Sequence, residues 1–209
     1  LFRSPAAKIF YNQLVQVPTK CHAVDRSRYV TCSALDWPLI GRSNELLFYP
    51  EHYLDAVASR QLPELQKPYI LFFHSTARAA KRWSNSSWVA LGRHLSLLGY
   101  QIVLPWGSGP EKAMSNEIAS QIPSALVPNA FSIEEAFSII ANASLVVGVD
   151  TGLTHLSAVL NKPTIEIYCD SPRWKTEGYW SGEIRNLGDT QDPPSADKVI
   201  QAATELLAQ

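Results

Sequence analysis

Residues 148–155, GVDTGLTH, place an acid, two threonines and a histidine at the start of an apolar segment. Asp150 and Thr151 directly follow an apolar run, and Gly152 comes next. If a helix begins here, its first N–H groups are unpaired and carry a partial positive charge. The absent side chain of Gly152, the hydroxyl of Thr151 and the imidazole of His155 would then favour a phosphate oxygen. The pattern predicts an anion site, with a plainly capped helix and a packed histidine as the alternative.

A second polar group, HSTARAAKRW at positions 74–83, follows another apolar run. Ser75 and Thr76 supply hydroxyls, and cations follow at Arg78 and Lys81. A diphosphate needs this mixture, because its oxygens take hydroxyl and amide donors and its charge needs a cation. A solvated basic loop is the alternative for this segment.

A third group, WGSGPEKA at 106–113, contains Gly107, which would let a ligand approach the backbone closely. Glu111 could accept hydrogen bonds from ribose hydroxyls, or its charge could simply favour the first turn of a helix. The segment is not a dinucleotide fingerprint, because the third glycine of GxGxxG is missing. We therefore do not expect a dehydrogenase.

The sequence contains no Asp-x-Asp pair and no His, Cys and Asp cluster with ligand spacing. Divalent ions that bridge a diphosphate need such carboxylate oxygens. We therefore expect no metal and no other cofactor, with the diphosphate neutralised by Lys, Arg and helix ends. The three cysteines are scattered and odd in number, which suits a reducing compartment.

Alternating strands and helices must position these loops. Apolar β-runs are predicted at 68–73, 101–106, 124–128, 145–149 and 163–168, and helices at 83–100, 110–122, 132–143, 151–160 and 195–209. Ser132 and Glu135 fit a capping box. The alternation predicts a parallel sheet covered on both faces, a doubly wound, Rossmann-like α/β domain. Ligands of such sheets bind at the carboxyl ends of the strands, where all three polar groups fall.

The first fifty residues differ from the rest. Two short helices are predicted at 5–16 and 22–35, and a linker rich in helix breakers leads into a strand-like segment at 46–49. Neither helix could form a core alone, so we assign residues 1–50 and 51–209 to different domains. The chain opens at Leu1 rather than Met, so its natural start could lie upstream.

Composition narrows the function classes. The formal net charge is −1, so no overall basic field favours nucleic acid. No apolar run approaches the roughly 18 residues of a membrane-spanning helix. Any anion site must therefore come from local placement of charge.

Three segments, FFHSTARAAKRWSNSSW, LPWGSGPEKA and GVDTGLTHLSAVLNKPTIEIY, resemble in order and spacing the ADP-heptose:lipopolysaccharide heptosyltransferases of glycosyltransferase family 9. HAVDR at 22–26 and the motif at 74–83 look closer to the heptosyltransferase I branch than to heptosyltransferase II. The resemblance implies a GT-B fold of two facing Rossmann-like domains. Residues 51–209 would be the nucleotide-sugar domain, and residues 1–50 a remnant of the acceptor domain.

The resemblance implies inverting transfer of heptose from ADP-heptose to the Kdo of lipid A. It also implies a cytoplasmic location with peripheral contact to the inner membrane, and no nucleic-acid partner. The positions that would hold the donor diphosphate and sugar are Thr76, Lys81, Asp150, Thr151, Gly152 and His155, with Ser75, Arg78, Gly107 and Glu111 beside them. The segment CDSPRWKTEGYW departs from the family's Gly-Pro-Thr-Asp-Pro pattern, so it receives no role.

The family's general base is an aspartate near the start of the acceptor domain, and no residue of this sequence matches it. We therefore expect this chain to bind the donor with little turnover. The alternatives are heptosyltransferase II, another family 9 enzyme, or a nucleotide-binding module without catalysis.

Overall fold

The computed structural model describes residues 14–39, 65 and 68–209. The chain divides into two compact units, residues 1–43 with 174–176 and residues 44–173 with 177–209. The predicted domain boundary at residue 50 and the strand-like segment 46–49 lie outside the described residues, so both stay predictions.

The smaller unit contains helix α1, Ala23–Ala34, inside the predicted range 22–35. His22 caps it, because its Nδ1 accepts a hydrogen bond of 3.2 Å from the N–H of Val24. The helix predicted at 5–16 does not extend through its described part, where residues 14–16 are not helical. Two features disfavour helix there: β-branched Val15, and Pro18, which restricts the residue before it.

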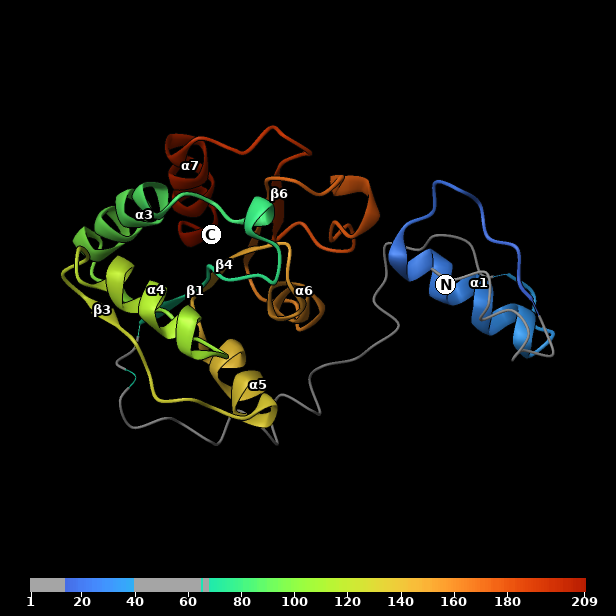
Figure 1. Ribbon diagram of the computed structural model, residues 1–209, viewed down its shortest axis with the longest axis horizontal. Coiled ribbons are helices and arrows are strands. Elements are labelled where there is room, and N and C mark those ends of the chain that lie inside the picture. The colour runs from blue at the N-terminus through green and yellow to red at the C-terminus, as the bar shows by residue number, and fades with distance from the viewer. Residues whose placement is uncertain (1–13, 40–64, 66–67) are drawn as a thin grey trace. The chain divides into compact units, whose positions relative to one another are not determined.

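The larger unit is built on a six-stranded sheet in which all neighbouring strands are parallel (Figure 1). The order across the sheet is β3-β2-β1-β4-β5-β6, the order of a doubly wound Rossmann fold. The strands are β1 Tyr69–Phe73, β2 Gln101–Val103, β3 Ala125–Leu126, β4 Leu145–Val149, β5 Thr164–Tyr168 and β6 Ile184–Gly188. The predicted fold class is confirmed.

Strand β6 is missing from the sequence prediction, which assigned no strand or helix between residues 168 and 195. Its sequence is IRNLG, and only Ile184 is buried. As the last strand of the sheet it has a neighbour on one side only, so it lacks the continuous apolar run that marks a central strand. The other five strands were predicted; β2 ends early, two residues before Pro105.

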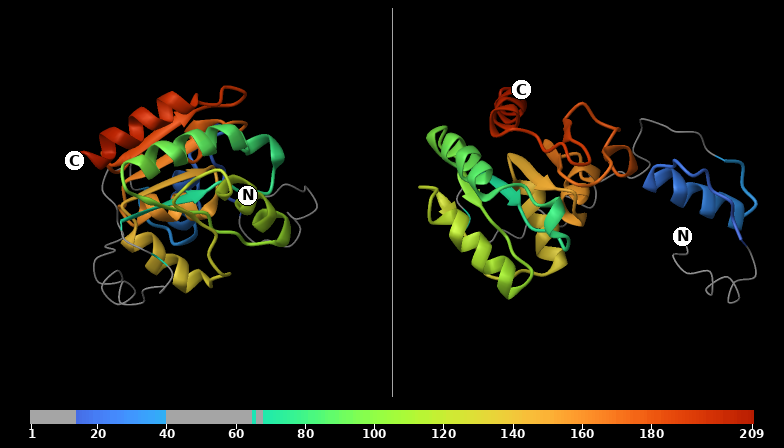
Figure 2. Two further views of the ribbon diagram at one scale, coloured as in Figure 1. Left: turned by 90° about the vertical axis from the view of Figure 1, so that its left-hand side faces the viewer. Right: turned by 45° about the horizontal axis from the view of Figure 1, so that its top comes forward.

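Helices cover both faces of the sheet (Figure 2). One core lies between the sheet and α3, α4 and α7, and the other lies between the sheet and α5 and α6. The bounds are α3 Asn85–Leu97, α4 Gly109–Ala119, α5 Ile133–Asn142, α6 Gly152–Val159 and α7 Ala196–Leu207. Successive strand side chains point to opposite faces, so Ile70 and Phe72 enter the first core while Leu71 and Phe73 enter the second.

Local signals explain where these helices begin. The predicted capping box of α5 is present: Ser132 Oγ accepts from the Glu135 N–H at 3.2 Å, and Glu135 Oε2 accepts from the Ser132 N–H at 2.7 Å. Helix α3 begins after Ser84, whose hydroxyl accepts from the Ser87 N–H at 3.1 Å.

The strand order determines where a ligand can lie. Strands β1 and β4 are neighbours, but the chain leaves β1 towards β2 on one side and leaves β4 towards β5 on the other. Their carboxyl ends, where Phe73 pairs with Gly148, therefore flank the point at which the strand order reverses. The two polar groups at 74–83 and 150–155 meet at this crevice.

Candidate functional site

The two polar loops are joined by an ion pair. Nζ of Lys81, at the end of the 3₁₀ turn Ala79–Lys81, lies 2.5 Å from Oδ2 of Asp150. Asp150 follows the last residue of β4 and is only 8% exposed, while the Lys81 side chain is 22% exposed. A partly solvated cation thus lies at the crevice, held by a buried carboxylate.

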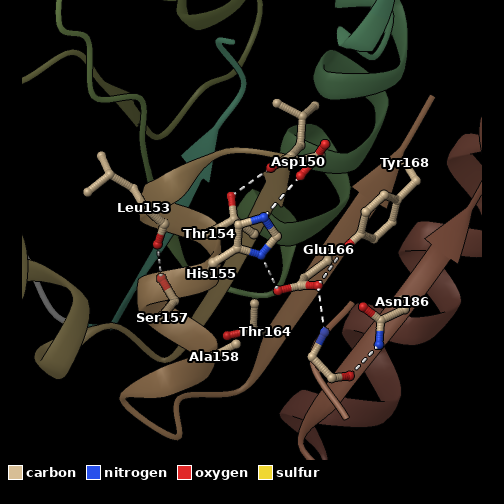
Figure 3. A network of polar contacts seen from close by, with 12 residues as sticks. Asp150, Leu153, Thr154, His155, Ser157, Ala158, Thr164, Glu166, Tyr168 and Asn186 are labelled. Atoms are coloured by element: carbon tan, nitrogen blue, oxygen red, sulfur yellow. Dashed lines mark hydrogen bonds and ion pairs between the residues drawn. The ribbon is translucent and has the colours of Figure 1, made fainter. Parts of the chain in front are cut away.

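His155 lies between two carboxylates (Figure 3). Its Nε2 is 3.0 Å from Oδ1 of Asp150, and its Nδ1 is 3.0 Å from Oε1 of Glu166. Burial alone would lower the pKa of His155, but the hydrogen bonds to Asp150 and Glu166 raise it to about 9. Burial would likewise raise the pKa of Asp150, but hydrogen bonds from His155 and Lys81 hold it well below its usual range. At neutral pH the His155 ring is therefore cationic and the Asp150 carboxylate is negatively charged.

Glu166 completes this centre, and the sequence reasoning missed it. It lies in the middle of β5 and is fully buried. Its Oε2 accepts hydrogen bonds from the Tyr168 hydroxyl at 2.7 Å and from the Gly178 N–H at 3.0 Å (Figure 3). The signal was present: a charged residue inside an otherwise apolar strand, TIEIY, must find partners when it is buried.

Helix α6 begins directly after the ion pair. Its N-cap residue, Thr151, has an extended backbone, and its side chain makes no capping hydrogen bond. The sequence alternative was a helix capped by Asp150 or Thr151, and the structure contradicts a side-chain cap by Thr151. A Cβ placed on Gly152 would meet no atom within 4 Å, so the space beside the first turn is open. The start of α6 thus offers amides and a hydroxyl to an open space.

Gly148 has a different role from Gly152. A Cβ at Gly148 would overlap the hydroxyl of Thr154. Thr154 is fully buried, and its hydroxyl donates to the carbonyl of Val149 at 2.9 Å. Gly148 therefore lets α6 pack closely against β4. This packing holds the first turn of α6 beside Asp150 at the carboxyl end of β4.

Ser75 is oriented by a buried histidine. Its hydroxyl lies 2.9 Å from Nδ1 of His74, and Nε2 of His74 lies 2.8 Å from the Ser115 hydroxyl. Burial lowers the pKa of His74 to about 4, so its imidazole is neutral. Each serine hydroxyl can donate or accept here, and the imidazole tautomer decides whether the Ser75 proton is available to a ligand.

A pocket of about 240 Å³ lies over the carboxyl ends of β1 and β2 and beside the first turn of α6. Ser75, Gly107, Glu111 and Thr151, all predicted site residues, line it. Its other walls are largely apolar, from Phe73, Pro105, Trp106, Phe131, Ile133, Ala136 and Leu153. The pocket therefore combines an apolar wall with a carboxylate and hydroxyls.

Glu111 stands at the first turn of α4, and its Oε2 accepts from the Gly107 N–H at 2.8 Å. The bond closes the loop after β2 on itself. The carboxylate also lines the pocket, so both sequence interpretations of Glu111 remain open.

The remaining predicted residues lie near the crevice. Thr76 is half-buried in the loop after β1. Arg78 is 59% exposed, and its Nη2 lies 2.9 Å from both the carbonyl and Oδ2 of Asp170, in the loop after β5. The structure thus ties Arg78 to a neighbouring loop, and its role toward a phosphate stays a prediction.

The three cysteines are buried and unbridged. Burial raises the pKa of Cys169, which lies near the crevice, to about 11 and keeps it a thiol. Among the residues that the structure describes, no group of three or more His, Cys, Asp or Glu is placed to hold a metal ion. Within the same residues, no helix has the length and apolar character needed to cross a membrane.

The model of glycosyltransferase family 9 (heptosyltransferase) matches residues 2–207. Lipopolysaccharide heptosyltransferase 1 of Salmonella typhimurium is 29% identical over 93% of this chain and 60% of its own length. The Pseudomonas aeruginosa protein of the same name is 30% identical over 94% of this chain and 53% of its length. The solved structure "E. coli heptosyltransferase WaaC with ADP" superposes with a TM-score of 0.78, at 28% identity over 98% of this chain and 62% of that one.

Proposed function

Because the chain belongs to glycosyltransferase family 9, the heptosyltransferase family, we propose that it binds ADP-heptose and forms the donor half of an inverting heptosyltransferase. The observation that carries this proposal is the Lys81–Asp150–His155 cluster at the start of α6, beside a pocket with an apolar wall. The chain spans between about half and three fifths of the length of the heptosyltransferase 1 relatives. The activity of a whole enzyme is therefore part of the proposal.

The diphosphate is proposed to lie at the start of α6. Thr151 offers a hydroxyl, and Gly152 leaves open space beside the first-turn amides. Lys81 supplies a cation whose charge-assisted bond to a phosphate is stronger than a neutral one. The negative charge of Asp150 is offset by its two cationic partners, so it does not repel the diphosphate.

The adenosine is proposed to occupy the pocket. Apolar walls suit the faces of a purine, and Trp106 is held in place by a 2.8 Å hydrogen bond from its Nε1 to the carbonyl of Pro128. The Glu111 carboxylate can accept hydrogen bonds from ribose hydroxyls while it keeps its hydrogen bond from the Gly107 N–H. A similar protein was solved as "E. coli heptosyltransferase WaaC with ADP-2-deoxy-2-fluoro heptose", with a TM-score of 0.72 at 29% identity. That likeness supports a donor of this class here.

In the proposed reaction an acceptor hydroxyl attacks the anomeric carbon of the heptose from the face opposite ADP. The new C–O bond forms as the bond to the β-phosphate oxygen breaks, and the configuration inverts. Negative charge develops on the departing ADP, where Lys81 and the start of α6 stabilise it. The proton of the acceptor goes to a base outside the described residues, since none of them matches the family's aspartate. This chain alone should therefore show little turnover.

The proposed acceptor is the Kdo of lipid A, at the cytoplasmic face of the inner membrane, because four curated relatives that match 87–97% of this chain are named heptosyltransferase 1. An already heptosylated acceptor, as for heptosyltransferase II, is the alternative. We propose that neither metal nor other cofactor takes part. ADP binding that is unchanged by EDTA would support this, and restoration by Mg²⁺ after EDTA would contradict it.

Titration calorimetry tests the donor site. ADP should bind saturably and more tightly than UDP or GDP, whose bases fill the pocket differently. Absence of saturable ADP binding would refute the proposal. Transfer from ADP-heptose to Kdo-lipid A, measured beside transfer to the heptosylated acceptor, then separates the two acceptor assignments.

A second candidate is a nucleotide-binding module without catalysis. The absence of a match to the family's base among the described residues favours it. ADP binding without transfer to either acceptor, even when the remaining part of the family's acceptor domain is supplied, would establish this candidate.

A further inference from the structure

We propose that Glu166 is a positioning residue of the donor site, which keeps His155 cationic and holds its ring against Asp150, so that the Asp150 charge stays offset and Lys81 faces the diphosphate. The link to the diphosphate rests on the proposed function. The link between Glu166 and His155 rests on the geometry alone.

The first observation is that the Glu166 carboxylate is fully buried yet has three donors. Its Oε1 accepts a hydrogen bond of 3.0 Å from Nδ1 of His155, and its Oε2 accepts hydrogen bonds from the Tyr168 hydroxyl and the Gly178 N–H. An unpaired buried carboxylate is strongly unfavourable, and even a paired one is seldom better for stability than an apolar side chain. The neighbours of Glu166 on the same face of β5, Thr164 and Tyr168, are equally buried and carry no carboxylate, so the sheet itself does not need an acid here.

The second observation is the count of N–H groups on His155. A neutral imidazole has one N–H and one acceptor nitrogen, so it can donate to one carboxylate only. Here both ring nitrogens lie 3.0 Å from carboxylate oxygens, one on Asp150 and one on Glu166. With both carboxylates ionised, both bonds can form only if the ring carries both protons. The pKa of His155, raised to about 9, agrees with this state.

The charged groups alternate from the crevice into the sheet. Lys81 pairs with Asp150, Asp150 with His155, and His155 with Glu166. Helix α6 has no other acidic or basic side chain, and on β5 the only carboxylate is that of Glu166. Without the Glu166 charge, His155 would keep one carboxylate and would lose its proton at a lower pH. Asp150 would then lose a cationic partner and turn more of its charge towards the diphosphate.

Glu166 also holds the loop after β5. The Gly178 N–H that it binds belongs to a residue whose carbonyl accepts a 2.7 Å bond from Asn186 Nδ2 on β6. Figure 3 shows Glu166 between His155 on one side and Tyr168 and Asn186 on the other. One carboxylate therefore connects the start of α6 to the loop after β5.

The test is Glu166→Gln, which keeps size and shape but removes the charge. NMR titration of the ligand-free protein, with histidine labelled and the signal assigned through His155→Gln, should show the pKa of His155 falling from about 9 towards 6.5. An unchanged pKa in a folded variant would overturn the proposal. Should the variant not fold, a wild-type His155 that already titrates near 6.5 would overturn it equally.

ADP affinity supplies a readout that a merely structural role would not give. The terminal phosphate of ADP also gains a proton at about pH 6, so the variant is compared with the wild type at each pH. In Glu166→Gln the affinity should stay close to wild type at pH 6, where His155 is still protonated, and be about tenfold weaker at pH 8. An equal loss at both pH values would mean that Glu166 only supports the fold.

Tyr168→Phe is the matched control, because it removes a donor to Glu166 and leaves the carboxylate. It should keep the raised pKa of His155 and should bind ADP about as tightly as the wild type at both pH 6 and pH 8. If wild-type protein binds no ADP at all, the proposed function fails, while the histidine titration still decides the role of Glu166.

Discussion

Lys81 Nζ lies 2.5 Å from Oδ2 of Asp150, although 69 positions separate the two residues in the chain. One follows β1 and the other follows β4, and these strands are neighbours in the sheet. The pair joins two loops that the sequence marks independently as anion-binding.

Replacing Lys81 with Ala should weaken ADP binding by about 1–3 kcal/mol, the range for a charge-assisted hydrogen bond. Lys81→Arg should not restore the affinity, because a planar guanidinium and a compact ammonium satisfy different geometries. Titration calorimetry measures both, with Lys198→Ala, on the exposed first turn of α7, as the control. Unchanged affinity in Lys81→Ala would remove Lys81 from the site.

The two glycines of the motif should respond oppositely to Ala. Gly152→Ala adds a Cβ to open space, so its free energy of unfolding should hold or rise by up to about 1 kcal/mol while ADP binding weakens. Gly148→Ala forces a Cβ onto Thr154 and should destabilise the fold by about 1–3 kcal/mol. Urea unfolding and calorimetry of each variant check this. Full ADP affinity in Gly152→Ala would place the ligand elsewhere.

His155 should make stability fall at alkaline pH. Its pKa rises from 6.5 in the unfolded chain to about 9 in the folded protein, so its contribution is complete below pH 6.5 and is lost as the pH rises through 9. The pKa difference corresponds to about 3 kcal/mol. Urea unfolding between pH 6.5 and 9.5 measures the slope. His155→Gln should flatten it, and an identical slope in that variant would contradict the assignment.

His74 should make the free energy of unfolding fall at acid pH, whereas His155 makes it fall at alkaline pH. Its folded pKa of about 4 lies below the ordinary 6.5, so its neutral form stabilises the fold above pH 6.5. As the pH falls from 6.5 to 4, the unfolded chain takes up a proton that the native state excludes, and stability should drop by about 3 kcal/mol. His74→Gln should reduce this loss. Urea unfolding curves of both proteins, recorded at several pH values between 4 and 6.5, measure the difference.

Elements with local signals were predictable. The capping box of Ser132 and Glu135 predicts the start of α5, and the apolar run LVVGV predicts the bounds of β4. Both signals lie in residues close together in the chain. Strand β6 was missed because IRNLG is a partly exposed edge strand without the apolar run of a central one. Glu166 was missed because its role depends on a histidine eleven positions earlier and on the Gly178 amide.

By itself the sequence determined that apolar strands alternate with helices and that each polar loop follows a strand, since these patterns depend on neighbours along the chain. Only the tertiary structure decided that β1 lies beside β4, and hence that Lys81 reaches Asp150. It also decided that His155 lies between two carboxylates. The physical reason is that strand order follows from packing helices on both faces of the sheet, and this packing brings together side chains that no local pattern relates.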